Sequence, residues 1–126
     1  MIVKIVPVFF TLEIARTVSW YAEKLGFECL GTWTPAADES PEYAIVARDG
    51  RAIHFRRAEP PMANPEKYAE ELLDAYLYVQ DADALYAEYA AKGVEFARGL
   101  GDMPWKCREF VVKDCDGRLL AFGADV

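Results

Sequence analysis

One short sequence phrase occurs twice in this chain and constrains its fold more than any other feature. Residues 48–55 read Arg-Asp-Gly-Arg-Ala-Ile-His-Phe, and residues 115–122, about 67 positions later, read Cys-Asp-Gly-Arg-Leu-Leu-Ala-Phe. The same offset aligns Gly26 with Gly93, Glu28 with Glu95, Val18 with Leu85 and Ala15 with Ala82. A repeat of this length indicates two copies of one supersecondary unit. The copies differ at a chemically important position, which is His54 in the first and Ala121 in the second.

The first copy, residues 1–58, predicts a β-α-β-β-β unit. β-branched and aromatic residues predict a strand over 2–10, although Pro7 lacks an N–H group and favours an edge strand, a bulge or exchange between subunits. Apolar residues at helical spacing predict a helix over 13–25 that ends at Gly26. Three strands are then expected at 27–34, 43–48 and 51–57, the last two joined by a hairpin turn at Asp49-Gly50.

The second copy, residues 72–126, has the same predicted order. Its elements are expected as a strand at 72–80, a helix at 82–92, a strand at 94–98, a loop at 99–104, a strand at 106–113, a turn at 114–117 and a strand at 118–124. A linker at 59–71 with three prolines and a short helical turn near 66–71 joins the copies. The sequence therefore predicts a single α+β domain, in which two tandem β-α-β-β-β modules form a curved mixed sheet around a cavity.

Composition excludes several classes of function. A net charge of -7 argues against nucleic-acid binding, because a phosphate backbone is held by clustered Lys and Arg. No apolar run approaches the roughly 18 residues that a membrane span requires. The three cysteines are an odd number without CxxC spacing, which is typical of reduced thiols. We therefore expect a cytoplasmic protein that binds neither nucleic acid nor a membrane.

Strand alternation selects the side chains that face the expected cavity. Residues two apart in a strand point to the same side of a sheet, so His54 shares a face with Arg56. In the strand that opens the second copy, Asp74, Tyr76 and Tyr78 form a polar and aromatic set that suits a wet cavity. Each aromatic ring that stacks on a flat or cationic ligand contributes about 0.5–2 kcal/mol to binding. The aromatic residues expected to do so are Trp33, Tyr43, Tyr76, Tyr78 and Trp105.

Several motifs follow one another in a fixed order. They are residues 7–27, beginning Pro-Val-Phe-Phe; Asp49-Gly50 through His54-Phe55; residues 76–89; and Pro104-Trp-Lys-Cys-Arg-Glu-Phe110 before Asp114-Cys-Asp-Gly117. This set resembles the vicinal oxygen chelate superfamily, which includes glyoxalases, extradiol dioxygenases, fosfomycin-resistance enzymes and bleomycin-resistance proteins. The motif Pro-Trp-x-x-Arg-Glu-Phe, with a proline in the first strand, is most similar to the bleomycin-resistance branch. The resemblance implies a cavity built from paired modules, often of two subunits, and hence a homodimer.

The resemblance also implies where a metal would bind in the enzymes of the superfamily. Four strand positions supply the ligands, and they fall on or next to Val6, His54, Asp74 and Ala121. Val6 and Ala121 have no donor atoms, and a stable catalytic metal site needs about three protein ligands. We therefore expect no cofactor and no catalytic residue. If a metal does bind, His54 and Asp74 are the residues expected to hold it.

These observations predict a metal-independent small-molecule binding protein of the bleomycin-resistance type. It would sequester a cationic or aromatic antibiotic, such as a bleomycin-like compound, in a cavity at the dimer interface. One alternative is a metal-dependent lyase, isomerase or dioxygenase-like enzyme with a degenerate metal site, and another is a ligand-sensing or purely structural dimer. Arg108 and Glu109 are also expected to take part in ion pairs. The predicted ligand-binding residues are Trp33, Tyr43, His54, Arg56, Asp74, Tyr76, Tyr78, Trp105 and Arg108.

Overall fold

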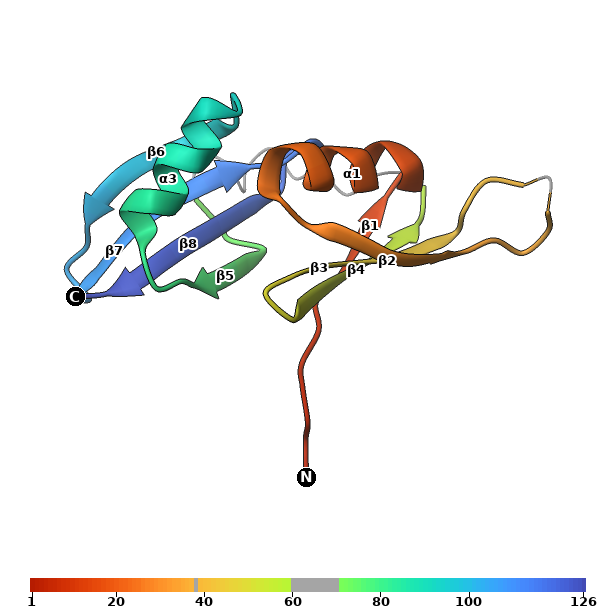
Figure 1. Cartoon of the computed structure of the whole chain (residues 1–126), viewed down its shortest axis with the longest axis horizontal. Coiled ribbons are helices and arrows are strands. Elements are labelled where there is room, and N and C mark those ends of the chain that lie inside the picture. The colour runs from red at the N-terminus through yellow and green to blue at the C-terminus, as the bar shows by residue number, and fades with distance from the viewer. Residues whose placement is uncertain (38, 60–70) are drawn as a thin grey trace. The chain divides into compact units, whose positions relative to one another are not determined.

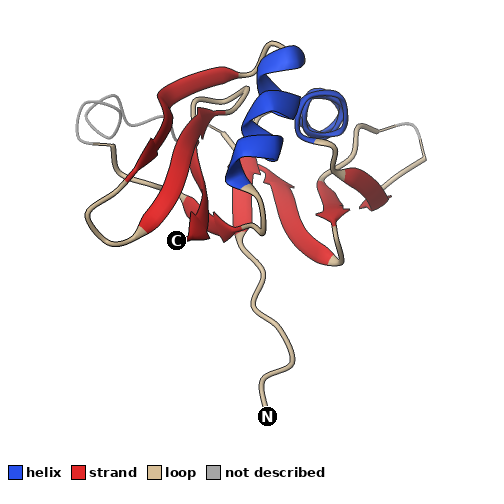
Figure 2. Ribbon diagram, turned by 60° about the vertical axis from the view of Figure 1, so that its left-hand side comes forward, coloured by secondary structure: helices blue, strands red, loops and turns tan. Residues whose placement is uncertain are grey.

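Two four-stranded mixed sheets, each with a helix on one face, make up the α+β fold (Figure 1, Figure 2). The computed structural model describes residues 1–37, 39–59 and 71–126. The chain divides into two compact units, Met1–Met62 and Ala63–Val126, and each contains one copy of the repeat. The predicted helical turn near 66–71 and most of the predicted linker lie outside the described residues.

The first unit has the predicted β-α-β-β-β order. Its sheet has the strand order β1-β4-β3-β2, in which β1 is parallel to β4 and the other pairs are antiparallel. The elements are β1 (Val8–Thr11), α1 (Ile14–Trp20), the π-helical turn η1 (Tyr21–Leu25), β2 (Glu28–Trp33), β3 (Tyr43–Arg48) and β4 (Arg51–Arg57). Strands β3 and β4 have the predicted bounds, because alternation and the Asp-Gly turn define them from both sides.

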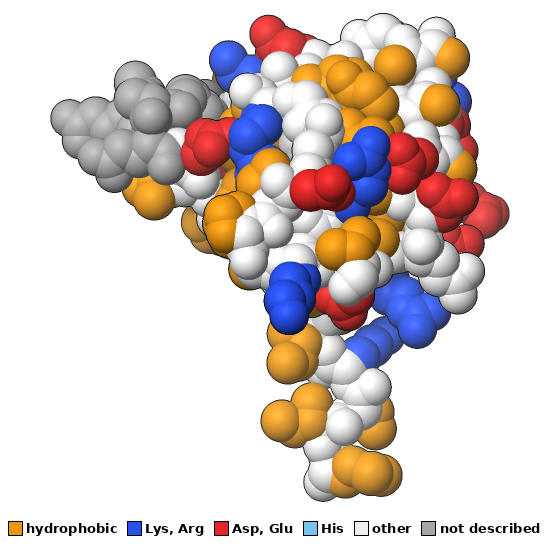
Figure 3. Space-filling model, turned by 90° about the vertical axis from the view of Figure 1, so that its left-hand side faces the viewer, with side chains coloured by type: hydrophobic (Ala, Val, Ile, Leu, Met, Phe, Trp, Pro, Cys, Tyr) orange, Lys and Arg blue, Asp and Glu red, His pale blue; other side chains and the backbone are white. Residues whose placement is uncertain are grey.

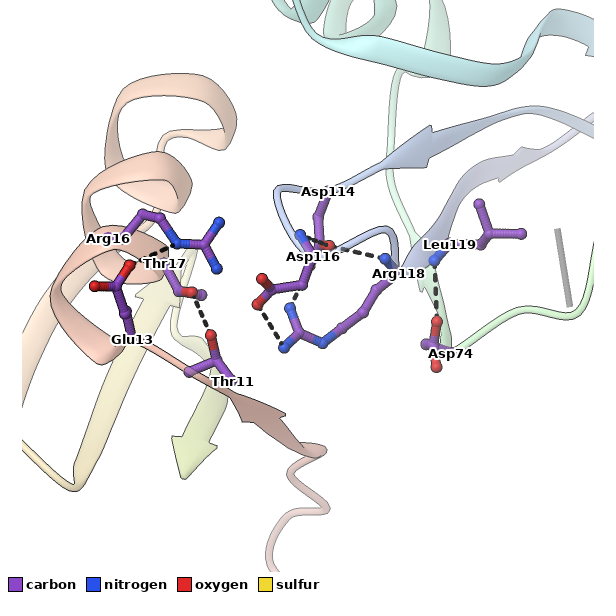
Figure 4. Close-up of polar contacts among 9 residues, drawn as sticks. All are labelled: Thr11, Glu13, Arg16, Thr17, Asp74, Asp114, Asp116, Arg118 and Leu119. Carbon is purple, nitrogen blue, oxygen red and sulfur yellow. Dashed lines mark hydrogen bonds and ion pairs between the residues drawn. The ribbon is translucent and has the colours of Figure 1, made fainter. Parts of the chain in front are cut away.

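The core of the first unit lies between the helix and the sheet. Tyr21 is completely buried and packs edge-on against Phe55, with ring centroids 4.9 Å apart. Thr11 at the end of β1 and Thr17 in α1 are also buried, and their hydroxyl oxygens lie 2.6 Å apart (Figure 4). This hydrogen bond joins the edge strand to the helix that covers it.

The predicted strand at 2–10 is shorter in the structure and begins only at Val8. Pro7 has no amide hydrogen, so its only backbone contribution to the sheet is its carbonyl, which accepts the His54 N–H at 3.0 Å. The preceding segment extends away from the sheet (Figure 1), and hydrophobic side chains lie along it (Figure 3). Met1, Ile2, Val3 and Ile5 are all exposed. The prediction that the strand begins at residue 2 was therefore wrong, since residues 2–7 are not part of β1.

The predicted helix at 13–25 changes its hydrogen-bonding pattern near its end. After α1, the backbone N–H of Gly26 bonds to the carbonyl of Tyr21, which is the spacing of a π-turn. Gly26 has φ of 74°, the left-handed conformation expected of a helix-ending glycine. Arg48 from β3 donates to the Leu25 carbonyl at 2.7 Å and so satisfies an acceptor at the helix end.

The second unit repeats this arrangement with the strand order β5-β8-β7-β6. Its elements are β5 (Ala75–Tyr78), α3 (Ala82–Ala91), β6 (Glu95–Asp102), β7 (Cys107–Lys113) and β8 (Leu119–Asp125). The Asp81 carboxylate accepts the Ala84 N–H at 3.0 Å and caps α3. Residues 99–102, predicted as part of a loop, continue β6, which accommodates its glycines through irregularities in register.

Aromatic rings form the helix side of the second core. Phe110 and Phe122 stack with centroids 5.4 Å apart, and Tyr89 of α3 packs edge-on against both.

The turn before β8 is fixed by Asp114, whose carboxylate accepts the backbone N–H groups of Asp116 and Arg118 (Figure 4). No helix in the described part of the chain combines the length and apolar character needed to cross a membrane.

Candidate functional site

Each sheet has one face that its own helix does not cover, which we call the helix-free face. On the first unit this face contains a pair of polar rings, Tyr43 from β3 and His54 from β4. The Tyr43 hydroxyl and His54 Nδ1 lie 2.8 Å apart, and the rings meet edge-on. Val8 lies beside His54 in the parallel β1–β4 register. The first unit thus presents His54 already engaged by a neighbouring tyrosine.

The predicted residues of the first unit share this helix-free face. Trp33 is opposite Tyr43 in the β2–β3 register, and Arg56 is opposite Tyr43 in the β3–β4 register. Residues opposite each other in neighbouring strands point to the same side of a sheet. Trp33 remains 60% exposed although it is a large aromatic residue. The structure therefore brings Trp33, Tyr43, His54 and Arg56 to one surface.

The helix-free face of the second unit carries an aromatic cluster built on a buried carboxylate. Tyr76 and Tyr78 of β5 are neighbours with ring centroids 4.9 Å apart. The Tyr76 hydroxyl donates to the Glu109 carboxylate, as does the Trp105 ring N–H at 3.3 Å. Arg98 of β6 donates to the other oxygen of Glu109 at 2.9 Å. Glu109 itself is only 1% exposed, so the side chains of this face are hydrogen-bonded to a carboxylate that lies beneath them.

The electrostatics of this cluster define its protonation state at neutral pH. Burial acts to raise the pKa of Glu109, but hydrogen bonds from Tyr76, Arg98 and Trp105 outweigh burial and leave the pKa below its usual value. Burial raises the pKa of Tyr76, and the hydrogen bond to the Glu109 carboxylate raises it further. Glu109 is therefore an anion, and Tyr76 is a neutral hydroxyl that donates to it.

Asp74 has a structural position at the start of the same sheet. Its carboxylate accepts the Leu119 backbone N–H at 3.0 Å (Figure 4), and its own amide donates to the Leu119 carbonyl at 2.9 Å. These bonds join the chain just before β5 to the first residue of β8. Asp74 thus aligns the parallel pair of strands that carries Tyr76.

Arg108 is not brought together with the other predicted residues of the second unit. It precedes Phe110 by two positions and so shares the helix side of β7, whereas Glu109 between them faces the other way. The guanidinium binds Asp83 of α3 at 3.0 Å and Asp102 of β6 at 3.1 Å. The pKa of Asp83 is lowered chiefly by its hydrogen bond to Arg108. Arg108 and Glu109 both form ion pairs, as expected, but with different partners on opposite faces.

Sequence reasoning missed the central role of Glu109 and all of the role of Arg98. The available signal was a carboxylate inside the strand Cys-Arg-Glu-Phe-Val-Val, on the same side of that strand as Val111. A charged residue at such a position needs partners once buried. Those partners come from β5, β6 and the β6–β7 turn, which no local pattern identifies.

The residues present do not fit the metal site of the superfamily's enzymes. Val6 and Ala121 have no donor atoms, His54 is hydrogen-bonded by Tyr43, and the Asp74 carboxylate binds the Leu119 amide. Within residues 1–37, 39–59 and 71–126, no three His, Cys, Asp or Glu side chains are grouped so that they could hold a metal ion. A stable catalytic metal requires about three such ligands.

Comparison with known proteins assigns the family. The sequence model of the Glyoxalase/Bleomycin resistance protein/Dioxygenase superfamily matches residues 4–122. The chain belongs to this superfamily. No curated protein sequence matches the chain significantly. Membership confirms the resemblance seen in the ordered motifs and accounts for the two β-α-β-β-β units.

Several solved structures share this fold. A bleomycin-binding protein from Streptomyces verticillus, complexed with copper(II)-bleomycin, is 25% identical with a TM-score of 0.72, covering 100% of this chain and 98% of its own. TnmS3, an antibiotic binding protein from a Streptomyces species, is 22% identical with a TM-score of 0.68, covering 100% and 99%. A glyoxalase-related enzyme from Clostridium phytofermentans is 21% identical with a TM-score of 0.80, covering 100% and 97%. Proteins with this fold thus include both binding proteins and an enzyme.

Proposed function

We propose that this protein binds an aromatic or cationic antibiotic-like molecule without metal and without chemical conversion. The observation that carries the proposal is the exposure of large aromatic side chains on the helix-free faces. Trp33, Tyr78 and Trp105 are 60%, 73% and 59% exposed. Exposed apolar surface flanked by polar residues is typical of ligand-binding or interaction surfaces. Such rings bind flat molecules by stacking and cations through their faces.

Two further observations support a ligand of this class, namely the net charge of the chain and the molecule bound to a structurally similar protein. A net charge of -7 favours association with a cation over association with an anion. The relative that is 25% identical was crystallised with copper(II)-bleomycin. A bleomycin-type glycopeptide is therefore the first ligand to test.

We also propose that the protein acts as a homodimer in the cytoplasm. The exposed Met1, Ile2, Val3 and Ile5 lie in an extended segment, and covering them with a second copy would remove apolar surface from water. Pro7 permits exchange between subunits because the segment before it does not continue the sheet of its own unit. Cys29 and Cys107 are not joined in a disulfide bond, which accords with a reducing compartment.

Titration of the purified protein with bleomycin, followed by calorimetry and tryptophan fluorescence, tests the proposal. Saturable binding at micromolar concentration is expected for the wild-type protein. The variants Trp33→Phe and Trp105→Phe should bind more weakly, whereas Trp20→Phe is the matched control because Trp20 lies in α1 and packs on Tyr21. Because a phenyl ring retains part of the stacking, each substitution should weaken binding by no more than the contribution of one ring, about 0.5–2 kcal/mol or about 2–30-fold.

Two results would contradict this function. Equal weakening by all three substitutions would show that the exposed aromatic residues have no particular role in binding. Near-stoichiometric Ni, Zn, Mn or Fe in protein purified without chelator, lost in His54→Ala, would favour the metal-dependent enzyme instead. Elemental analysis obtains the second result before any ligand is identified.

A further inference from the structure

We propose that Glu109 is a positioning residue of the ligand-binding surface, holding the rings of Tyr76 and Trp105 in one fixed arrangement. The inference rests on the proposed binding function and deepens it by assigning the residue that shapes the aromatic surface. Glu109 is buried beneath the helix-free face of the second unit and has no access to a ligand. Its effect on binding must therefore pass through the side chains that it anchors.

The carboxylate of Glu109 is fully engaged by three different donors. Its Oε2 accepts from the Tyr76 hydroxyl and from Trp105 Nε1, and its Oε1 accepts from Arg98 Nη2. Hydrogen bonds to an ionised carboxylate are stronger than bonds between neutral groups. Trp105 is 59% exposed on a turn, and a side chain with that exposure would otherwise be free to change rotamer. Its bond to a buried anion fixes the direction of the indole.

Arg98 holds Glu109 in its charged form. The guanidinium bridges Glu109 and Glu71, with N–O distances of 2.9 Å and 3.0 Å, and its Nη1 reaches the Met103 sulfur at 3.1 Å. The buried anion is therefore balanced by a cation whose own contacts fix its orientation. Such a balanced pair gives the Tyr76 and Trp105 donors a rigid acceptor.

Gly123 of β8 provides an independent observation that the position of Tyr76 is built into the sheet. A Cβ atom added at Gly123 would clash with the Tyr76 hydroxyl oxygen and lie 3.2 Å from the Glu109 Cβ. The backbone of Gly123 is outside the left-handed region, so glycine is needed here for space and not for conformation. The corresponding position of the first unit, opposite Tyr43 in the antiparallel pair, is Arg56. The absence of a side chain at Gly123 thus leaves the space through which Tyr76 reaches the buried carboxylate.

This arrangement restricts the chemistry that the surface offers to a ligand. The Tyr76 hydroxyl and the Trp105 N–H both point to Glu109, so their polar hydrogens are already used. What remains for a ligand are the ring faces, together with the neighbouring ring of Tyr78. Affinity for this surface should therefore follow the area of a flat ring system more than its number of hydrogen-bonding groups.

The test uses Glu109→Gln and Gly123→Ala, with Gly99→Ala as the matched control. A Cβ added at Gly99 would make only an ordinary contact, 3.5 Å from the Tyr86 hydroxyl. One set carries Trp20→Phe and Trp33→Phe, which leaves Trp105 as the single tryptophan. Near-ultraviolet circular dichroism at its long-wavelength edge and fluorescence anisotropy excited there, where tyrosine does not absorb, then report on Trp105. A second set, with all tryptophans present, is titrated with proflavine, a planar cation, and with bleomycin.

Both Glu109→Gln and Gly123→Ala should lose most of the long-wavelength signal of Trp105. Both should also weaken ligand binding about tenfold, or about 1.4 kcal/mol, because the rings no longer keep one arrangement. Gly99→Ala should change neither quantity. If Glu109→Gln fails to fold by far-ultraviolet circular dichroism, Gly123→Ala carries the test. Folded variants that retain the wild-type Trp105 signal and affinity would overturn the proposal. A wild-type protein that binds neither probe would refute the proposed function, whereas loss of the Trp105 signal would still show that Glu109 positions the ring.

Discussion

Replacing Tyr76 by Phe tests the energetic role of the buried carboxylate. The substitution removes one hydroxyl and leaves the ring, so it deletes the hydrogen bond to Glu109 while preserving most of the packing. Because Glu109 is 1% exposed, water cannot readily replace the lost donor. Loss of a hydrogen bond to a charged group costs about 1.5–3 kcal/mol, so we expect the free energy of unfolding at pH 7 to fall by about 2 kcal/mol.

Tyr78→Phe is the matched control on the same strand. Tyr78 is 73% exposed, so its variant should differ from wild type by no more than about 0.5 kcal/mol. Urea unfolding at pH 7, followed by circular dichroism, measures both variants, and an unchanged slope with urea confirms that the comparison concerns stability alone. Equal stability of Tyr76→Phe and Tyr78→Phe would refute the importance of the Tyr76–Glu109 bond.

The same pair of residues predicts how stability depends on pH. The pKa of Glu109 is lower in the folded protein than its ordinary value of 4.5. The carboxylate therefore contributes stability that is fully present above about pH 4.5 and is lost as the pH falls through the folded pKa. The difference between wild type and Tyr76→Phe should accordingly shrink as the pH is lowered below 4.5. A difference that stays constant from pH 7 to pH 3 would show that Glu109 is not the partner responsible.

Two further predictions concern the repeat and the N-terminal segment. Asp114→Asn should lower the free energy of unfolding by about 3 kcal/mol, because it breaks a buried ion pair with Arg118. Its control is Asp49→Asn in the corresponding turn of the first copy, where the carboxylate is exposed and the cost should be no more than about 0.5 kcal/mol. Equal effects in urea unfolding would contradict this difference. Deletion of residues 2–6 should convert the proposed dimer into a monomer in size-exclusion chromatography with light scattering, because each buried apolar side chain contributes about 1.5–3 kcal/mol. A deletion variant that stays dimeric would place the interface elsewhere.

Most elements of the fold were predictable from the sequence, because the two copies of the repeat each indicated the same order of strands and helix. Alternation bounded by an Asp-Gly turn defined β3 and β4, and the matching turn before β8 confirmed the offset. The N-terminal strand was predicted too long, since β-branched composition shows strand preference but not whether a pairing partner exists. At the end of the π-turn Tyr21–Leu25, the Leu25 carbonyl accepts from Arg48, which lies far along the chain, and no local pattern identifies this contact.

The candidate site was predictable only in part. Alternation correctly placed His54 and Arg56 on one face of β4, and Tyr76 and Tyr78 on one face of β5. It did not reveal that Glu109 would be buried, because its partners Arg98 and Tyr76 come from separate strands. The direction of Arg108 follows from its alternation with Glu109, but its Asp83 partner required the position of α3. Pairings between elements therefore account for what sequence reasoning missed.

The central claim is that the protein binds its ligand without metal and without converting it. The most direct measurement is calorimetric titration of bleomycin into protein treated with chelator, followed by mass spectrometry of the recovered ligand. We predict saturable micromolar binding that chelator treatment does not change, and recovery of the ligand with its original mass. Near-stoichiometric Ni, Zn, Mn or Fe in the untreated protein, with binding of metal-free bleomycin lost when that metal is removed, would contradict the account. Recovery of a chemically altered ligand would also contradict it.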